Sequence, residues 1–210
     1  LSLAKSCAYD QWSVGKTVIL QKGLSPEGML WEPIPSFSGQ FKGNGHTISD
    51  LTITGQYSPA GLFGIVEEQG SIESLSVRGI VSVSDSADTT TGGIVGINHG
   101  TLINCQFTGV VTGDSEVGGI VGRNESEGTI DHSTARAIVT GKSSTGGIAG
   151  YNLGAITGCT NVGSINTEYQ EASLDTDGFT AKMVDQIDNK MAAADDDATN
   201  SVTHVATDTG

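Results

Sequence analysis

Gly119-Ile120-Val121-Gly122 is one of four short motifs in which two glycines bracket two apolar residues. The other three are Gly61-Leu62-Phe63-Gly64, Gly93-Ile94-Val95-Gly96 and Gly147-Ile148-Ala149-Gly150. The last glycines of successive motifs are 32, 26 and 28 residues apart in this chain of 210 residues. A recurrence at this spacing is typical of repeat proteins, in which one short unit stacks on the next.

A second pattern follows each motif and can be counted from a glycine. From Gly100, apolar or small residues stand two, five, seven, nine and eleven positions later: Leu102, Cys105, Phe107, Gly109 and Val111. The same offsets from Gly70, Gly128 and Gly154 give mostly apolar or small residues, with Ser133 and Asn161 as the polar exceptions. The last four positions lie two residues apart with polar residues between them, which indicates a β-strand with one buried face.

His46, taken as an earlier origin, adds a fifth copy with Ile48, Leu51, Ile53, Gly55 and Tyr57 at the same offsets. One copy alone has too little apolar surface to form a core, so the copies are expected to stack strand on strand. The sequence therefore predicts an all-β fold, a single parallel β-solenoid. Asn98, Asn124 and Asn152 each lie two residues after the last glycine of a motif, and stacking would align them in a ladder.

These motifs resemble the GLUG repeats of bacterial surface proteins, and residues 31–34 and 37–53 resemble the segment that commonly precedes such repeats. The resemblance extends from about Trp31 to Asn166. It implies a right-handed parallel β-helix and transfers no catalytic residue, since the motif positions are structural. It also implies a place in a large exported protein, such as an adhesin, a cell-wall-attached protein or the non-catalytic region of an immunoglobulin A protease.

The chain divides into three parts. Residues 1–30 are expected to form an N-terminal cap and a first strand, and residues 31–166 the β-helix. Residues 167–210 hold ten acidic residues and two lysines, and are expected to form an acidic C-terminal cap. A helical stripe in this last part predicts a helix over the last coil or, alternatively, a docking helix for another domain: Phe179, Met183, Val184, Ile187 and Met191.

The excess of acidic residues makes some classes of binding partner unfavourable. With 24 acidic and 10 basic residues, the formal net charge is −14, which disfavours nucleic acid and anionic membranes as partners. No run of 18 apolar residues is present, so we expect no membrane insertion. Because the chain begins at Leu1 without a leader sequence, we expect a processed protein or a piece of a longer one.

Three cysteines occur, at positions 7, 105 and 159. Cys7 belongs to the expected N-terminal cap. Cys105 and Cys159 share one inner column with Ser133 between them, so two strand spacings of about 4.8 Å separate them. That distance exceeds the limit of about 7 Å between Cα atoms for a disulfide. Both are therefore expected to be buried free thiols.

The links between the strand pattern and the next motif vary in length, which predicts a row of outer loops on one side of the solenoid. These links are rich in groups that can bind sugar hydroxyls or a calcium ion. We take five of their residues as the predicted ligand row: Asp85, Asp88, Thr90, Asp114 and Glu116. They lack the spacing of an EF-hand and the four histidines lack that of a zinc site, so no metal or other cofactor is assigned.

An enzyme is the alternative, because parallel β-helices also occur in polysaccharide lyases and glycosidases. Glu73 and Asp131 share one offset with Ile103 between them, which places them about 9–10 Å apart, near the range of inverting glycosidases. No aromatic sugar platform or basic cluster accompanies them. The sequence therefore favours a non-catalytic, extracellular module of a cell-surface protein, either adhesive or a spacer. Its expected partners are glycans or proteins of a host or cell wall, and other domains of a larger chain.

Overall fold

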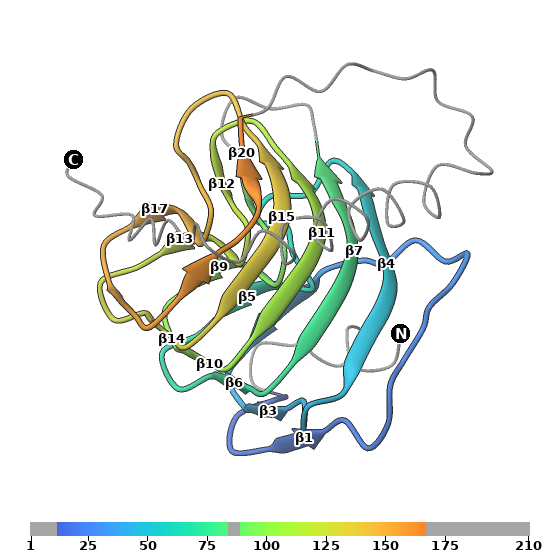
Figure 1. Ribbon diagram of the computed structural model, residues 1–210. Helices are drawn as coiled ribbons and strands as arrows, with labels where there is room; N and C mark the ends of the chain where they lie inside the picture. Colours follow the sequence, from blue (N-terminus) through green and yellow to red (C-terminus); the bar gives the residue numbers. More distant parts are fainter. Residues whose placement is uncertain (1–11, 84–88, 167–210) are drawn as a thin grey trace, which may run out of the picture.

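The computed structural model of the chain describes residues 12–83 and 89–166. These residues form strands that pair in parallel, and no helix occurs in the two ranges. Figure 1 shows the strands stacked side by side, from the N-terminal coil in blue to the C-terminal coil in orange. The all-β solenoid predicted from the repeats is confirmed.

The strands belong to four sheets, which we call A, B, C and D. Sheet A holds β1 (Thr17–Ile19), β3 (Gln40–Lys42), β6 (Ser71–Glu73), β10 (Thr101–Ile103), β14 (Thr129–Asp131) and β18 (Ala155–Thr157). Sheet B holds β4 (Thr47–Gly55), β7 (Ser76–Val83), β11 (Gln106–Thr112), β15 (Thr134–Thr140), β19 (Thr160–Asn161) and β20 (Ser164–Ile165). Sheet C holds β2 (Ile34–Phe37), β5 (Phe63–Val66), β9 (Val95–Asn98), β13 (Val121–Asn124) and β17 (Ala149–Asn152). Sheet D holds β8 (Thr90–Gly92), β12 (Glu116–Gly118) and β16 (Thr145–Gly146).

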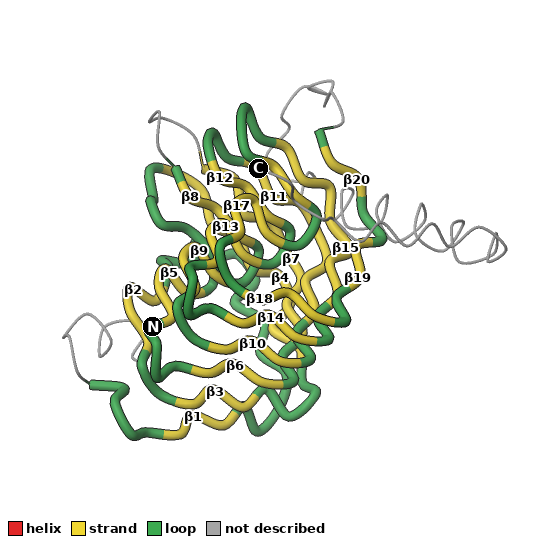
Figure 2. Tube along the Cα trace, turned by 90° about the vertical axis from the view of Figure 1, so that its left-hand side faces the viewer, coloured by secondary structure: helices red, strands yellow, loops and turns green. Residues whose placement is uncertain are grey.

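A complete coil passes through sheets D, C, A and B in that order. Strands β8, β9, β10 and β11 follow one another along the chain and lie in those four sheets. Strand β12 then returns to sheet D beside β8. The five strands of sheet C belong to five successive turns of the solenoid. Figure 2 shows the strands of sheet A and those of sheet C as two separate stacks along the solenoid.

A single residue in the left-handed conformation makes the corner between sheets A and B. Ser74, Asn104 and His132 hold this position in three coils, with φ of 52°, 52° and 46°. Asn and His are enriched among residues that adopt this conformation. The corner directs the next residue of each coil into the interior, where Cys105 and Ser133 are buried.

The inner columns follow the predicted register. Phe107 pairs with Val77 and Ala135, and Val111 pairs with Val139. These side chains are 0% exposed. The offsets therefore identify the buried face of sheet B, because a shift by one residue would have turned the whole set outward.

Both glycines of the repeated motif are required by close packing. A Cβ atom on Gly119 would lie 2.9 Å from Cβ of Ala135, across the interior in sheet B. A Cβ atom on Gly122 would lie 2.7 Å from Cγ2 of Thr90 and from the backbone nitrogen of Thr91. The absence of a side chain on the first glycine leaves room for the inward side chains of sheet B. The absence of one on the last glycine allows sheet D to lie against sheet C.

The asparagine ladder is confirmed. Nδ2 of Asn98 donates to Oδ1 of Asn124 at 2.8 Å, and Nδ2 of Asn124 donates to Oδ1 of Asn152 at 2.8 Å. Asn124 also donates to the carbonyl of Gly128 at 3.2 Å, within its own turn. In the second turn of sheet C, Val66 occupies the equivalent place and pairs with Asn98. The ladder ties consecutive C-to-A turns together inside the solenoid.

The register predicted for the earliest copy is wrong. Counting from His46 aligned Ile48 with Ile72, but the residue beside Ile72 is Phe41. Ile48 instead pairs with Val77 in sheet B. Four of the five residues counted from His46 therefore belong to other columns: Ile48, Leu51, Ile53 and Gly55.

A β-bulge in the same strand explains why the wrong count looked regular. The register shifts between Ile48 and Leu51, where Asp50 adopts a φ of 57°. The inward residues Ile48 and Leu51 therefore lie three positions apart, as do the residues at offsets two and five of the regular copies. The correct origin is Gly39, whose carbonyl accepts a hydrogen bond from the first strand residue of β6. A bulge inserts one residue and so breaks the strict alternation of inward and outward side chains.

Only part of the expected caps lies among the described residues. The first strand expected near residues 16–20 is β1, which pairs with β3 at the edge of sheet A. The proposed helix in residues 167–210 and Cys7 lie outside the described residues. Within residues 12–83 and 89–166 there is no helix with the length and hydropathy needed to cross a membrane.

Candidate functional site

Three members of the predicted ligand row lie among the described residues. Asp114 lies in the turn between β11 and β12, as predicted for a link between strands. Thr90 and Glu116 belong to β8 and β12 of sheet D, so their interpretation as loop residues is corrected. Oγ1 of Thr90 donates to Oε2 of Glu116 at 3.1 Å. Asp85 and Asp88 lie outside the described residues.

Glu116 reaches from sheet D to an arginine on the outer face of sheet C. Nη2 of Arg123 lies 2.9 Å from Oε1 of Glu116, and Nη1 lies 3.6 Å from Oε1 of Glu125. The guanidinium also lies 4.9 Å from the ring centre of Tyr151, on the neighbouring strand β17. We call Thr90, Glu116, Glu125, Arg123 and Tyr151 the Arg123 cluster.

The repeat places these residues by a simple rule. The residue directly after the last glycine of each motif faces outward from sheet C, and these positions stack in register: Ile65, Ile97, Arg123 and Tyr151. The offset pattern does not predict this column, because the pattern concerns only inward positions. The shared position after the glycine is the signal that could have revealed it.

The Arg123 cluster combines partial exposure with groups of opposite charge. The side chains of Arg123, Glu116 and Glu125 are 36%, 18% and 21% exposed. Nε of Arg123 is buried and has no hydrogen-bond partner among the described residues. A planar guanidinium stacked on an aromatic ring, next to carboxylate and hydroxyl oxygens, offers both donors and acceptors to a polar ligand.

Asp114 connects neighbouring coils through an ion pair and hydrogen bonds. Its carboxylate pairs with Nζ of Lys142, and its backbone carbonyl accepts a hydrogen bond from the Lys142 N–H at 3.0 Å. Its own N–H donates to Oγ1 of Thr89 at 2.9 Å. Asp114 and Glu116 thus each face a basic side chain. No group of three metal-ligating residues was found among the described residues.

The two carboxylates weighed as a glycosidase pair keep their predicted places. Ile103 lies between Glu73 and Asp131 in the register of sheet A. Asp131 pairs with Nδ1 of His132 at 2.8 Å, and that histidine side chain is 65% exposed. Glu73 lies beside Lys42 of β3. The two carboxylates therefore have separate neighbours.

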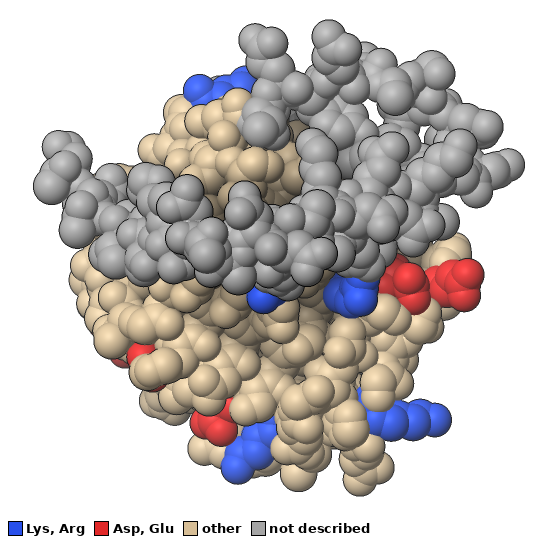
Figure 3. Space-filling model, in the orientation of Figure 1, with Lys and Arg blue, Asp and Glu red and all other residues tan. Residues whose placement is uncertain are grey.

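The charged groups on the face drawn in Figure 3 are scattered. Basic and acidic side chains of the described residues appear there singly or in small groups, with no broad patch of one sign.

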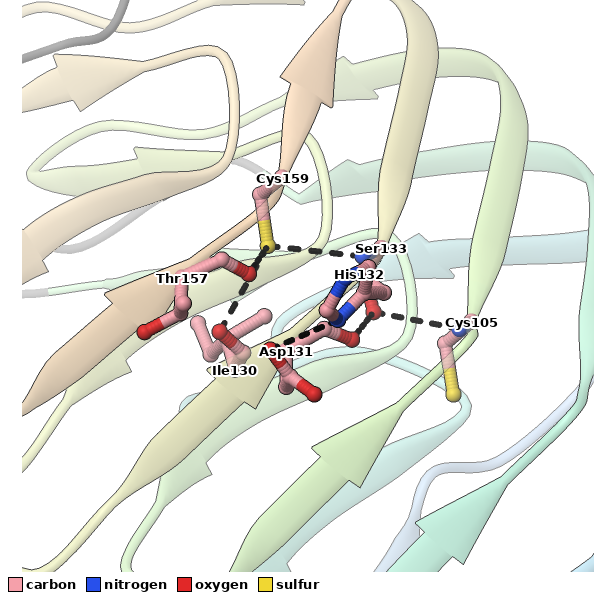
Figure 4. Close-up of polar contacts among 7 residues, drawn as sticks. All are labelled: Cys105, Ile130, Asp131, His132, Ser133, Thr157 and Cys159. Atoms are coloured by element: carbon pink, nitrogen blue, oxygen red, sulfur yellow. Dashed lines mark hydrogen bonds and ion pairs between the residues drawn. The ribbon is translucent and has the colours of Figure 1, made fainter.

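Figure 4 shows the inner column that holds the two cysteines. Oγ of Ser133 accepts a hydrogen bond from the Cys105 N–H at 3.1 Å and donates to the Asp131 carbonyl at 3.1 Å. The Ser133 N–H in turn donates to Sγ of Cys159 at 3.4 Å. Each polar side chain thus satisfies a backbone group at the corner of the neighbouring coil.

Both cysteines are free, but their burial differs. Cys105 is 1% exposed, as expected. Cys159 is only half-buried, which corrects the expectation that both are buried, because it belongs to the last described coil. Burial raises the pKa of the Cys105 thiol from 9.0 to about 12, and burial also raises the pKa of Cys159.

This difference predicts selective alkylation. With iodoacetamide at pH 8, Cys159 should react at least about tenfold faster than Cys105 in the folded protein, since the reactive species is an accessible thiolate. Because burial raises the pKa of Cys105 from 9.0 to about 12, the folded state favours the protonated thiol. The stability that this thiol contributes is therefore fully present below pH 9 and is lost as the pH rises toward the folded pKa of about 12. Peptide mass spectrometry would measure the labelling, with both thiols reacting alike in urea as the control. Equal labelling of the folded protein, or a Cys105–Cys159 disulfide, would contradict this arrangement.

The family model of the GLUG motif matches residues 113–140. Residues 113–140 carry a GLUG motif. The matched residues span one coil, from the turn before β12 to the end of β15. They include Glu116, Arg123 and Glu125 of the Arg123 cluster. The GLUG glycines are the two whose packing brings sheets B and D close to sheet C.

Two curated proteins are similar to part of this chain. The chain is 34% identical over 114 residues to halomucin of Haloquadratum walsbyi, an alignment that covers 54% of this chain and 1% of halomucin. It is 31% identical over 144 residues to a protein of Evansella cellulosilytica named as a Gly-rich membrane protein, covering 50% of this chain and 16% of the relative. The chain thus spans only a small fraction of the curated relatives that it matches.

A solved structure shares the fold. It is a crystal structure of a Bacteroides ovatus protein titled as an immunoglobulin A1 protease, with a TM-score of 0.50 and 16% identity. The alignment covers 78% of this chain and 76% of the other. At this identity the similarity concerns the solenoid fold alone.

Proposed function

We propose that this chain is a non-catalytic, extracellular repeat module of a cell-surface protein, and that it adheres to glycans through the Arg123 cluster. The names of the two relatives, a mucin-like name and a membrane protein, support a place at the cell surface. The small share of each relative that the chain covers supports a module within a much longer protein. A parallel solenoid suits this role because its length grows one coil at a time.

The observation that carries the adhesive role is the stacking of Arg123 on Tyr151 beside Glu116. Sugars present vicinal hydroxyls that bond to carboxylates and guanidinium groups, while their C–H faces pack on aromatic rings. Thr90 adds a hydroxyl to the same edge of sheet D. The apolar anchors are few, so we expect weak binding at one cluster and adhesion through many copies.

Binding to immobilised glycans should depend on this cluster. We expect Arg123→Ala and Tyr151→Ala to reduce the retained protein by about tenfold, since each removes one of the central contacts. The matched control is Lys42→Ala, which removes one positive charge from the outer face of sheet A. Melting curves should show all three variants folded, because partly exposed ion pairs are worth about 1 kcal/mol or less.

Other outcomes would overturn the adhesive role. Unchanged retention of Arg123→Ala would remove the cluster from it. A wild-type protein that binds no glycan would favour the spacer, a role supported by the continuous ladders that join successive coils. Release of reducing ends from any polysaccharide would favour the enzyme alternative, and exchange of Glu73 or Asp131 would then locate the activity.

A further inference from the structure

The outer face of sheet B carries a stripe of apolar side chains. Ile80, Val110 and Ile138 stand in register on β7, β11 and β15. They alternate with the inward residues, and none of them belongs to the interior cluster. Although these side chains face away from the interior, Ile80 is only 7% and Val110 only 8% exposed.

The stripe has a basic border and polar ends. Two residues before Ile80 and Ile138 lie Arg78 and Arg136, both in register with Thr108 between them. Thr52 and Ser164 end the stripe on the neighbouring strands. The apolar part therefore extends over two strand spacings, about 10 Å, which is the length of about two helical turns laid across it.

The chain itself supplies an element of complementary chemistry. Residues 167–210 follow directly on β20, which pairs with β15 of this same sheet. They carry ten acidic residues and two lysines, Lys182 and Lys190. The apolar side chains of residues 179–191 recur at helical spacing, with Asp185 and Asp188 among them.

We propose that residues 179–191 dock on the outer face of sheet B, with their apolar stripe on Ile80, Val110 and Ile138 and their carboxylates toward Arg78 and Arg136. The twelve residues 167–178 can span about 40 Å when extended, far more than the few strand spacings from β20 to the stripe. In this position the segment covers the outer face of sheet B. This surface is separate from the Arg123 cluster, so the proposal does not depend on glycan binding.

Limited trypsin digestion of the full chain tests the proposal at the two tail lysines. In the wild-type protein, cleavage after Lys182 and Lys190 should be slow. Val110→Asp should accelerate it about tenfold, because a buried carboxylate replaces an apolar contact and opposes an acidic segment. Met183→Asp should have the same effect and leaves every solenoid residue unchanged, so it remains informative if Val110→Asp impairs folding.

The matched control is Ile97→Asp, an outward apolar residue on sheet C, which should leave the cleavage rate as in the wild type. Equal cleavage of the wild type and Met183→Asp would overturn the proposal. Protection that falls on dilution, together with a dimeric mass in light scattering, would assign the docked segment to a second copy and also overturn it. Slow, concentration-independent cleavage that both variants accelerate supports it.

Discussion

Replacing Val111 with Asp is expected to lower the free energy of unfolding by about 3–5 kcal/mol, because it places an unpaired charge in the interior. Val111 is 0% exposed and lies between Val81 and Val139 in the central columns of sheet B. For a chain of this size, the melting temperature should fall on the order of 10 °C. Urea unfolding followed by circular dichroism would measure the change.

The pH dependence of this variant separates charge from packing. Burial raises the pKa of a carboxyl, so the folded state would favour the neutral form. The deficit relative to wild type should therefore grow as the pH rises from 4 to 7. Val111→Ala should show a smaller deficit without this trend, and Thr101→Asp, which adds the same charge on the outer face of sheet A, should be nearly neutral. A variant as stable as wild type would mean that Val111 is not an interior residue.

Replacing Asn124 with Ala should lower the free energy of unfolding by about 2–4 kcal/mol, since it interrupts the buried ladder at its centre. Asn124 is 0% exposed, accepts from Asn98 and donates to Asn152. Its removal leaves one N–H of the buried Asn98 amide without its acceptor and Oδ1 of Asn152 without its donor, while the Gly128 carbonyl keeps its bond from the Ala155 N–H. The cost of such orphaned groups exceeds the modest net worth of one hydrogen bond.

The matched control for the ladder is Asn152→Ala. Asn152 makes the same bond to its own turn, to the Gly154 carbonyl at 3.1 Å, but lies at the partly exposed end of the ladder. Water can replace the lost partners there, so Asn152→Ala should lower the free energy of unfolding by about 1 kcal/mol or less. Chemical denaturation with unchanged slopes would make the two values comparable. Equal deficits would show that the ladder is not cooperative and that each asparagine serves only its own turn.

Much of the solenoid could be predicted because its inner face repeats in the sequence. The offsets that contain Phe107 and Val111 proved to be true columns, as did the position of Asn124. Only two strands per copy were recognised, whereas each complete coil has four. Strands β8 and β12 have three residues each, too few for alternation to be distinguished from a loop.

The sequence by itself determined which residues face the interior in the four regular copies. In a strand, a slip of one residue turns every side chain to the other face, so only one register buries the apolar set. The tertiary structure alone decided the rest. The bulge near Asp50 disguised the true register of the first copy, because the three-residue step from Ile48 to Leu51 looks like the corner of a regular copy. The tertiary structure also decided that Glu116 contacts Arg123. These residues lie on different sheets, and they approach each other only where Gly122 lets sheet D lie against sheet C.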